Sequence, residues 1–444
     1  MTNKISTPIA DFVKAYAENG GARLHMPGHK GKEFLGFEKF DITEIKGADA
    51  LYEADGIIAE SEGNASRLFG TARTLYSTEG SSQCIRAMMY LIGLNSGKGR
   101  KPVVLAARNV HKTFVFAAAL LDIEVRWLWP EEKGSICSCP VSAGMVEKAL
   151  DEGCVDAVYI TSPDYLGGMA DIKAIADVCH KKGVILAVDN AHGAYLRFLK
   201  ESHHPMDMGA DICCDSAHKT LPVITGGAYL HISHNAPETF REQAKYAMAL
   251  FGSTSPSYLC MASLDMCNAY LSDGYEARLN ETVLKIKKVK NELQRNGYET
   301  VASDPLKITV KVPEGSTGND VAEKLRERDI ECEYADPDFV VLMMTPENDE
   351  GDFEKLLSAL GKSDKPCRSA EVSITKAETA LSIRDAVMSA SETIRANDAE
   401  GRICRVPTVS CPPAIPVVVP GEIISREAVE VFKYYDIKEV DVIK

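Results

Sequence analysis

Between about residues 78 and 233, the sequence alternates short apolar runs with longer segments of helical spacing. This alternation is typical of βαβ units, whose parallel strands form one sheet with helices on its faces. The expected strands are Val103–Ala107, Ala157–Thr161, Val184–Val188, Ile212–Cys214 and Ala228–Ile232. Helical patterns lie at Gln83–Leu94, Thr113–Leu121 and Asp171–Lys182. The sequence therefore predicts an α/β fold built on a mostly parallel sheet.

The chain beyond this region predicts a second, smaller α+β region. A long helical pattern runs from about Met261 into the charged run Glu281–Gln294, and an α+β pattern follows near 300–365. Helical spacing returns at 366–398. The segment Pro407–Gly421 contains five of the 20 prolines, which excludes a helix interior and predicts an extended loop along the surface.

These patterns suggest a division of the 444 residues into three parts. We expect an N-terminal arm at 1–40, a large domain at 41–275 and a smaller C-terminal α+β region at 276–444. Sequence patterns place such boundaries only to within several residues.

The composition narrows the possible functions. Lys and Arg number 50 against 64 Asp and Glu, so the net charge is −14 and nucleic acid is not an expected partner. No apolar run has the roughly 18 residues that a membrane helix needs, and the first residues lack the apolar core of a signal peptide. The 13 cysteines are scattered without zinc-knuckle spacing, so we expect a cytoplasmic protein with no disulfide framework and no metal site.

Polar residues follow four of the expected strands in succession. They include Arg108–Lys112, Ser162–Tyr165, Asp189–Gly193 and Asp215–Lys219. Ligands of open parallel sheets bind beyond the carboxyl ends of the strands, so we expect these residues to form one convergent site.

Several of these residues have the chemistry that pyridoxal phosphate requires. Lys219 can form a Schiff base, and Asp189 can pair with a pyridine nitrogen, although a surface charge and a helix cap are the respective alternatives. The turn Gly80-Ser81-Ser82 before a helix can hold a phosphate or simply provide an N-cap. His111 can stack on an aromatic ring or serve a structural role. Together the four features favour the cofactor.

Short motifs also recur along the chain in a specific order. They are Leu24–Gly31, Asp41–Glu44, Phe69-Gly70, Arg108–Lys112, Thr161–Pro163, Val188–Gly193, Asp215–Pro222, Thr254–Tyr258, Pro412–Pro416 and Pro420–Glu422. Their order and spacing resemble the ornithine/lysine/arginine decarboxylase family. The resemblance implies the pyridoxal-phosphate fold type I, also called the aspartate-aminotransferase type, with a seven-stranded type of sheet. It also implies a short form without the N-terminal regulatory domain of larger relatives.

The resemblance assigns roles to individual residues. Lys219 would hold the cofactor covalently, Asp189 would pair with its pyridine nitrogen, and His111 would stack on its ring. Ala191 would lie beneath the ring and His192 beside it. The phosphate would be held by Gly80, Ser81, Ser82, Ser216, His218 and, from a neighbouring subunit, Thr254. Lys219 or His218 would protonate the product, and a homodimer would be the minimum assembly.

The implied activity is decarboxylation of arginine, lysine or ornithine to its amine, a step of polyamine biosynthesis. Departures from the family pattern occur at Asn190, Asp164, Gly226, Cys411 and Ala414. They keep open an aminotransferase or another lyase reaction on the same fold. A regulatory paralogue is a third reading, which the joint presence of the lysine, aspartate and histidine disfavours.

The loop Gly47–Gly56 also departs from the family pattern. Its acidic residues Asp49, Glu53 and Asp55 could meet the cationic tail of a basic substrate, or could form a solvated acidic loop.

Overall fold

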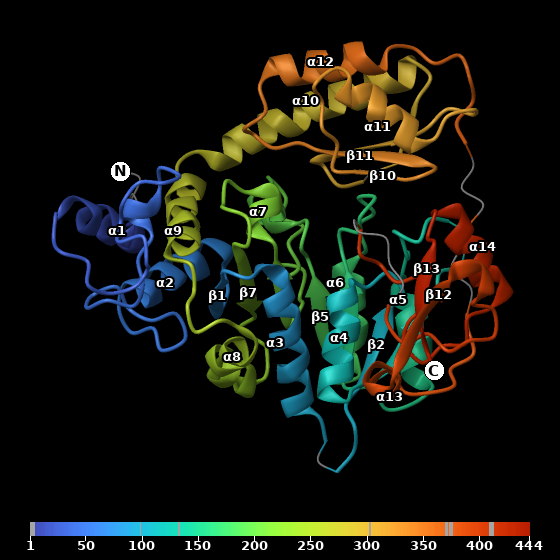
Figure 1. Ribbon diagram of the computed structural model, residues 1–444, viewed down its shortest axis with the longest axis horizontal. Helices are drawn as coiled ribbons and strands as arrows, with labels where there is room; N and C mark the ends of the chain where they lie inside the picture. Colours follow the sequence, from blue (N-terminus) through green and yellow to red (C-terminus); the bar gives the residue numbers. More distant parts are fainter. Residues whose placement is uncertain are drawn as a thin grey trace. The chain divides into compact units, whose positions relative to one another are not determined.

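A computed structural model describes residues 5–97, 99–131, 134–301, 303–368, 372, 376–407 and 413–444. The chain divides into two compact units, each assembled from two separate segments (Figure 1). Unit 1 consists of Met1–Ser96 and Ile172–Arg278, and unit 2 consists of Gly97–Asp171 and Leu279–Lys444. The expected parts 1–40, 41–275 and 276–444 follow a different, sequential division and stay a prediction.

Seven strands within the described residues form the large, mostly parallel sheet. Unit 1 contributes four strands in the order β1 (Arg73–Ser77), β7 (Ala228–Ile232), β6 (Ile212–Asp215) and β5 (Ile185–Asp189). β5 and β6 are parallel, whereas β7 is antiparallel to both of its neighbours. Unit 2 contributes the parallel strands β4 (Ala157–Thr161), β2 (Val103–Ala107) and β3 (Glu124–Leu128). The predicted α/β fold is confirmed.

Helices cover the unit 1 strands. They are α1 (Pro8–Glu18), α2 (Ile57–Phe69), α3 (Gly80–Asn95), α6 (Ile172–Lys181), α7 (Ala217–Thr220), α8 (Glu238–Phe251) and α9 (Tyr258–Ser272), with 3-10 turns η1 (Glu38–Phe40) and η2 (Ala194–Phe198). In α6, the buried residues Ile172, Ile175, Ala176 and Cys179 follow the helical repeat and give the helix one apolar face. α3 packs on α8 and on strands of the sheet, so its first turn lies near the strand ends.

Unit 2 combines its three parallel strands with two smaller sheets (Figure 1). The four-stranded antiparallel sheet has the order β10 (Tyr334–Ala335), β11 (Phe339–Met343), β9 (Lys307–Lys311) and β8 (Glu299–Thr300), and the other sheet pairs β12 (Ser391–Arg395) with β13 (Glu439–Ile443). Its helices are α4 (Lys112–Leu121), α5 (Ala143–Asp151), α11 (Gly318–Arg326), α12 (Glu350–Leu360), α13 (Ile383–Met388) and α14 (Arg426–Tyr434), with the turn η3 (Ala396–Asp398). The helix α10 (Tyr275–Arg295) begins in unit 1 and continues into unit 2.

Three sequence expectations need correction. The long helical pattern breaks at Gly274, whose φ of +67° ends α9 before α10 begins. Among the described residues of 366–398, α-helix occupies only α13, and the remainder includes strand β12 and the 3-10 turn η3. The described part of the proline-rich segment, 413–421, is irregular as predicted, but its residues are buried rather than spread on the surface.

Candidate active site

The first turn of α3 in unit 1 is built to receive an anion. Gly80 has a φ of +71°, and an added Cβ there would meet no described atom within 4 Å. The N-cap residue of this 16-residue helix, Glu79, makes no side-chain capping hydrogen bond. The backbone N–H groups and the dipole of the helix therefore favour a negative charge. Ser216 Oγ donates to Ser81 Oγ (2.8 Å), which brings two hydroxyl groups together at this turn.

The turn before β7 accepts hydrogen bonds from Gly80 and His218. Gly80 donates its N–H to the carbonyl oxygen of Gly226 (2.7 Å), and His218 Nδ1 donates to the carbonyl oxygen of Gly227 (2.9 Å). Gly226 has a φ of +101°, and an added Cβ would lie 2.8 Å from the carbonyl oxygen of Thr78. This close approach explains a glycine at one of the positions that depart from the family pattern.

Lys219 and His192 form a pair of nitrogens in the same unit. Lys219 lies in the short helix α7, directly after β6, and His192 lies in the loop after β5. Lys219 Nζ is 3.1 Å from His192 Nε2, and the His192 side chain is buried. The pair can therefore share a proton at the amine that the sequence predicts to be reactive.

Asp189 ends strand β5 and is 2% exposed. Its Oδ1 accepts the N–H of Ala191 (3.2 Å) and the S–H of Cys214 (3.6 Å). These contacts fix the orientation of the carboxylate beyond the strand end. A cationic ligand nitrogen is the kind of partner that a buried carboxylate requires.

A buried cluster next to these residues was not predicted as a unit. Asp215, His204 and His231 are each fully buried, and both histidines donate from Nε2 to Asp215 Oδ2 (3.0 Å each). Asn190 donates from Nδ2 to Asp215 Oδ1 (2.7 Å). Burial alone would raise the pKa of Asp215, but the two imidazoles lower it below its usual value. The carboxylate is therefore held ionised inside the protein.

The sequence comparisons decide the family. Residues 7–303 match the family described as "Orn/Lys/Arg decarboxylase, major domain", and residues 367–440 match its C-terminal domain. The chain belongs to the Orn/Lys/Arg decarboxylase family. An arginine decarboxylase of Bacillus subtilis is 29% identical, with 97% of this chain and 94% of the relative covered. An arginine decarboxylase of Bacillus anthracis is also 29% identical, with coverages of 96% and 92%.

Solved structures agree with this assignment at the level of the fold. The lysine decarboxylase LdcF of Francisella novicida has a TM-score of 0.81 at 18% identity, covering 100% of this chain and 82% of its own. The constitutive lysine decarboxylase of E. coli has a TM-score of 0.79 at 18% identity, with coverages of 99% and 82%. A serine palmitoyltransferase of Sphingomonas wittichii matches less closely, with a TM-score of 0.57 at 14% identity and coverages of 80% and 83%.

Two further residues of the predicted Orn/Lys/Arg decarboxylase site, His111 and Thr254, lie in different local settings. His111 belongs to unit 2, where it is the N-cap of α4 and its Nδ1 accepts the N–H of Thr113 (3.2 Å). This bond leaves the proton of a neutral imidazole on Nε2. Thr254 is exposed in a unit 1 loop, and its neighbour Ser253 donates its N–H to Glu79 of the same chain. The predicted roles of His111 at the ring and of Thr254 across a subunit boundary stay predictions.

In the acidic loop at 47–56, the Asp49 carboxylate accepts hydrogen bonds from backbone N–H groups. Asp49 adopts a φ of +67°, and its carboxylate accepts N–H groups from Ala50, Asp55, Gly56, Ile58 and Ala59. Burial opposes ionisation, but these bonds lower the pKa of Asp49 below its usual value. The carboxylate therefore caps the start of α2. This role favours neither of the two hypotheses for Asp49, contact with the cationic tail of a substrate or a position in a solvated loop. Glu53 and Asp55 remain exposed.

The C-terminal motif of the family is fixed to the end of β2 within unit 2. Arg108 is 1% exposed and donates to the carbonyl oxygens of Pro416 (2.9 Å) and Val417 (3.0 Å). It also pairs with Glu422 (3.3 Å), and Lys112 donates its N–H to the carbonyl oxygen of Ala414 (2.9 Å). Residues 414–417 are therefore held beside the start of α4. Cys411, another departure from the family pattern, lies outside the described residues.

Asp164, a further departure, has a structural role in unit 2. It is 6% exposed, and it accepts the Ser138 hydroxyl (2.6 Å) and the Gly168 N–H (2.7 Å). Burial raises its pKa above the usual value. Its bonds close the turn 164–168, so the aspartate shapes the loop after β4.

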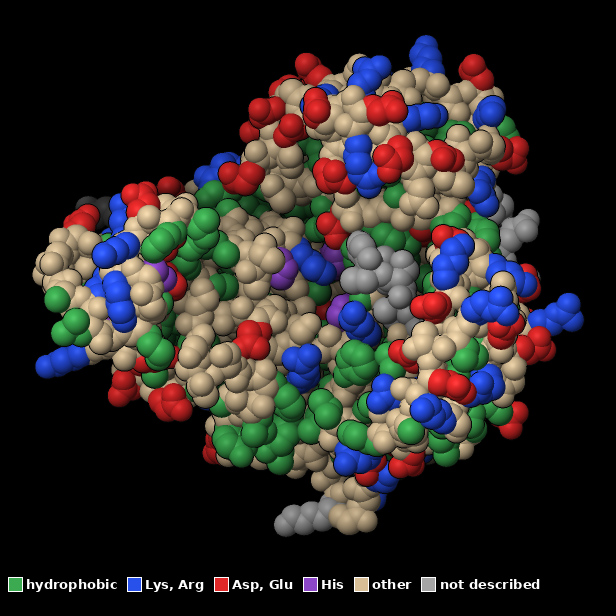
Figure 2. All heavy atoms as spheres, viewed as in Figure 1, with side chains coloured by type: hydrophobic (Ala, Val, Ile, Leu, Met, Phe, Trp, Pro, Cys, Tyr) green, Lys and Arg blue, Asp and Glu red, His purple; other side chains and the backbone are tan. Residues whose placement is uncertain are grey.

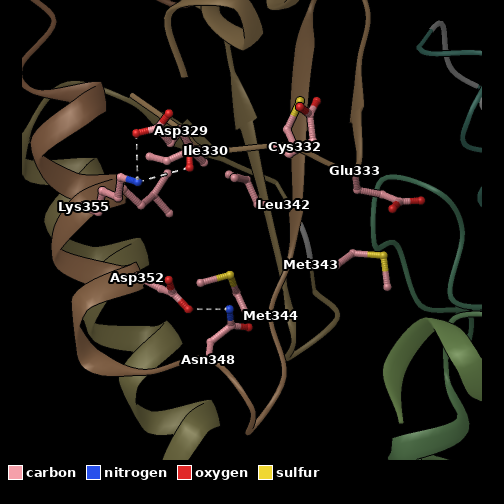
Figure 3. Close-up of a pocket in the computed structure, with 12 residues that line it drawn as sticks. Asp329, Ile330, Cys332, Glu333, Leu342, Met343, Met344, Asn348, Asp352 and Lys355 are labelled. Carbon is pink, nitrogen blue, oxygen red and sulfur yellow. Dashed lines mark hydrogen bonds and ion pairs between the residues drawn. The ribbon is translucent and has the colours of Figure 1, made fainter. Parts of the chain in front are cut away.

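A pocket in unit 2 contains none of the predicted site residues. It has a volume of about 410 Å³ and lies between α12, the end of β11 and the segment 329–333 that precedes β10 (Figure 3). Several carboxylates surround it, but Lys355 pairs with Asp329 (3.9 Å), and Asn348 donates to Asp352 (2.8 Å). Its charged groups are exposed, so the acidic rim alone does not assign a ligand.

Proposed function

We propose that this protein uses pyridoxal phosphate to decarboxylate a basic L-amino acid, arginine, lysine or ornithine, to the corresponding amine. The main support for the proposal is the distance of 3.1 Å between Lys219 Nζ and His192 Nε2. Both residues belong to unit 1, which also contains Asp189 and the first turn of α3. The curated relatives named arginine decarboxylase support this reaction over an aminotransferase or another lyase reaction.

The donor groups of unit 1 fit the three functional parts of the cofactor. The open space at Gly80, with the hydroxyls of Ser81 and Ser216, suits a phosphate. In the proposal Ser82 and His218 also contact the phosphate, and Thr254 reaches it from a second subunit. Asp189 would hold the pyridine nitrogen, because a buried carboxylate is stabilised by a positively charged partner.

The remaining groups would contact the cofactor ring or transfer a proton. Ala191 and His111 would contact the ring, and Lys219 Nζ would be the amine that holds the cofactor. His192 Nε2 accepts a proton from Nζ at 3.1 Å, which leaves Lys219 as a neutral nucleophile. The cofactor, when bound, supplies an electron sink for the charge that the departing carbon dioxide leaves at the α-carbon. Lys219 or His218 then delivers a proton to that carbon.

A homodimer is the proposed assembly. The N-terminal part of unit 1 exposes large hydrophobic side chains, as the space-filling view shows at its surface (Figure 2). These are Leu24 (93% exposed), Met26 (65%), Phe34 (76%), Leu35 (77%) and Phe37 (46%). Clustered apolar exposure of this kind is typical of a protein interface. A second copy of the chain would cover it and bring its Thr254 to the neighbouring site.

No helix within the described ranges combines the length and hydrophobicity that crossing a bilayer requires. The 12 cysteines in the described part of the chain are free thiols. Free, mostly buried thiols are common in reducing compartments, and we propose a cytoplasmic location with polyamine biosynthesis as the process served.

The test supplies the purified protein with pyridoxal phosphate and offers arginine, lysine and ornithine separately. Carbon dioxide and the matching amine should form with at least one of them, and the Lys219→Ala variant should form neither. Formation of a keto acid instead would replace the proposal with an aminotransferase. Failure of the wild-type protein to bind the cofactor, followed by absorbance, would remove the enzyme assignment altogether.

A further inference from the structure

One buried carboxylate connects the two loops that carry Asp189 and Lys219. Asp215 is the last residue of β6, and the segment that follows it leads directly to Lys219. Its Oδ1 accepts a hydrogen bond from Asn190 Nδ2 (2.7 Å), and Asn190 directly follows Asp189. Asp215 and Asn190 are both 0% exposed. The two loops are therefore joined inside the protein, where water does not compete for the bond.

The other oxygen of Asp215 is anchored to the body of unit 1. His231 Nε2 donates to Oδ2 from β7, while its Nδ1 contacts Thr74 Oγ1 on β1 (2.8 Å). His204 Nε2 donates to the same oxygen from the segment after η2. The ring of Phe69 lies 4.5 Å from the ring of His231, which restricts the imidazole further. Asp215 is thus fixed by elements that precede and follow its own strand in the sequence.

The loop that carries Asn190 is packed tightly around the amide. An added Cβ at Gly193 would lie 2.0 Å from Asn190 Oδ1 and 2.7 Å from Leu196 Cδ1. Gly193 also donates its N–H to the carbonyl oxygen of Asn190 (2.8 Å). Only a glycine permits this approach, so the amide has little freedom to turn away from Asp215.

A metal ion is the alternative explanation for this cluster. The ligand-type atoms of His204, Asp215 and His231 lie within 4.8 Å of one another. However, His204 Nδ1 accepts the N–H of Met206 (3.4 Å), which places the proton on Nε2. A protonated Nε2 donates to the carboxylate and cannot bind a metal at the same time. Hydrogen bonding therefore accounts for the geometry better than metal coordination does.

We infer that Asp215, anchored by His204 and His231, is a positioning residue that holds Asp189 in place relative to Lys219 through Asn190. This inference rests on the proposed function, because Asp189 and Lys219 are the groups assigned to the cofactor. None of the anchoring side chains needs to touch substrate for the effect to operate.

The test compares Asp215→Asn with a matched control at the other end of β6. Asp211 lies directly before β6, is 5% exposed, and accepts from the Leu186 N–H (2.8 Å) and His180 Nε2 (3.2 Å). It is therefore also a buried aspartate with a histidine partner, but at the opposite end of the strand. Both variants are prepared as apoprotein, and cofactor binding, the pH titration of the bound cofactor's visible absorbance, and thermal unfolding are measured.

We expect Asp215→Asn to weaken cofactor binding about tenfold, since a hydrogen bond to a charged group is lost from the link. The titration midpoint should fall by roughly half a pH unit or more, because a buried negative charge is removed from the strand end that leads to Lys219. Asp211→Asn should lower the melting temperature but leave the binding constant and the midpoint unchanged. Equal binding constants and midpoints in both variants would reduce Asp215 to a structural residue and overturn the inference.

Two further variants keep the test decisive if Asp215→Asn does not fold. Asn190→Ala removes the hydrogen bond between Asn190 and Asp215 but leaves Asp215 bonded to both histidines. It should weaken cofactor binding, as Asp215→Asn does. In the double variant Asn190→Asp/Asp215→Asn, the amide and carboxylate exchange places, so the hydrogen bond can form again. Cofactor binding should recover relative to Asn190→Ala, and unchanged weak binding would contradict the inference.

The remaining outcomes separate this inference from the proposed function. Wild-type protein that binds no cofactor would remove the proposed function and, with it, the inference. Wild-type protein that binds the cofactor while Asn190→Ala binds it equally well would remove the inference alone. Metal analysis of the purified protein should find no zinc, and one equivalent lost in His204→Gln would show that the cluster is a metal site.

Discussion

Carboxylates occupy two contrasting settings in this protein. At the end of β6 in unit 1, Asp215 is fully buried and accepts three hydrogen bonds from His204, His231 and Asn190. At the unit 2 pocket, the side chains of Asp329 and Glu331 are 95% and 73% exposed, and each has a cationic partner at the surface. A buried carboxylate requires a fixed set of donors, whereas an exposed one is served by water. The buried carboxylate is therefore held in one orientation, whereas the exposed carboxylates are free to exchange their partners for water.

The largest expected difference between the two regions concerns their lysines. Lys219→Ala should lower the rate of amine formation by about 10²–10⁴-fold or more, because a proton-transferring amine is lost. Lys355→Ala removes an exposed lysine paired with Asp329 and should leave the rate within about twofold. The rate is measured as amine released from the best substrate. Similar losses in both variants would show that the pocket belongs to the catalytic site.

The next effect concerns folding stability. Asp215→Ala should lower the free energy of unfolding by about 3–5 kcal/mol, because two buried histidines and an asparagine lose their acceptor. Asp329→Ala should change it by about 0–1 kcal/mol. Urea denaturation of both variants measures the difference. A small effect at Asp215 would mean that the cluster relaxes around the missing carboxylate.

Another buried carboxylate of unit 1, Asp265, should make the stability depend on pH. Asp265 accepts from Ser61 Oγ (2.5 Å) and the Ala10 N–H (2.9 Å), and burial raises its pKa from 3.8 to about 6. A raised pKa contributes stability that is fully present below the unfolded value and is lost as the pH rises through 6. The stability advantage of wild type over Asp265→Asn should therefore fall by roughly 2–3 kcal/mol between pH 4 and pH 7. Urea denaturation across this range should give a flat difference only if burial does not raise this pKa.

The smallest effect is expected at the rim of the pocket. Glu331→Gln breaks an exposed ion pair with Arg326 (2.9 Å) and should change the free energy of unfolding by less than about 0.5 kcal/mol. The change should disappear in roughly 1 M salt, where surface charges are screened. A larger, salt-independent change would place Glu331 in the same class as the buried carboxylates.

The sequence predicted the buried strands well because they are continuous apolar runs. β2, β4 and β7 have the predicted bounds, and β5 and β6 differ by a residue at their ends. β1 and β3 were missed, because Arg73 and Thr74 interrupt the apolar character of β1, and Glu124 and Arg126 interrupt that of β3. Both strands form by backbone pairing, β1 with β7 and β3 with β2. The helical spacing within 366–398 was misleading, since β12 forms there through pairing with β13 at the far end of the chain.

The candidate site was predictable where its residues follow strands. Lys219, His192 and Asp189 lie at neighbouring strand ends in unit 1, as the α/β pattern requires. The partners of Asp215 were not predictable, since His204 comes from an irregular segment and His231 from inside β7. A signal was nevertheless present, because His231 interrupts the apolar run Ala228–Ile232 and a histidine buried there needs a partner.

The bonds from Arg108 to the backbone of Pro416 and Val417 also bear on the order of synthesis. Arg108 is made 308 residues before Pro416, the first of these acceptors. The end of β2, where His111 begins α4, therefore cannot reach its final packing while the ribosome is still extending unit 2. A chain truncated before residue 416 would leave the Arg108 guanidinium without these acceptors, so the packing of this strand end depends on a segment made much later.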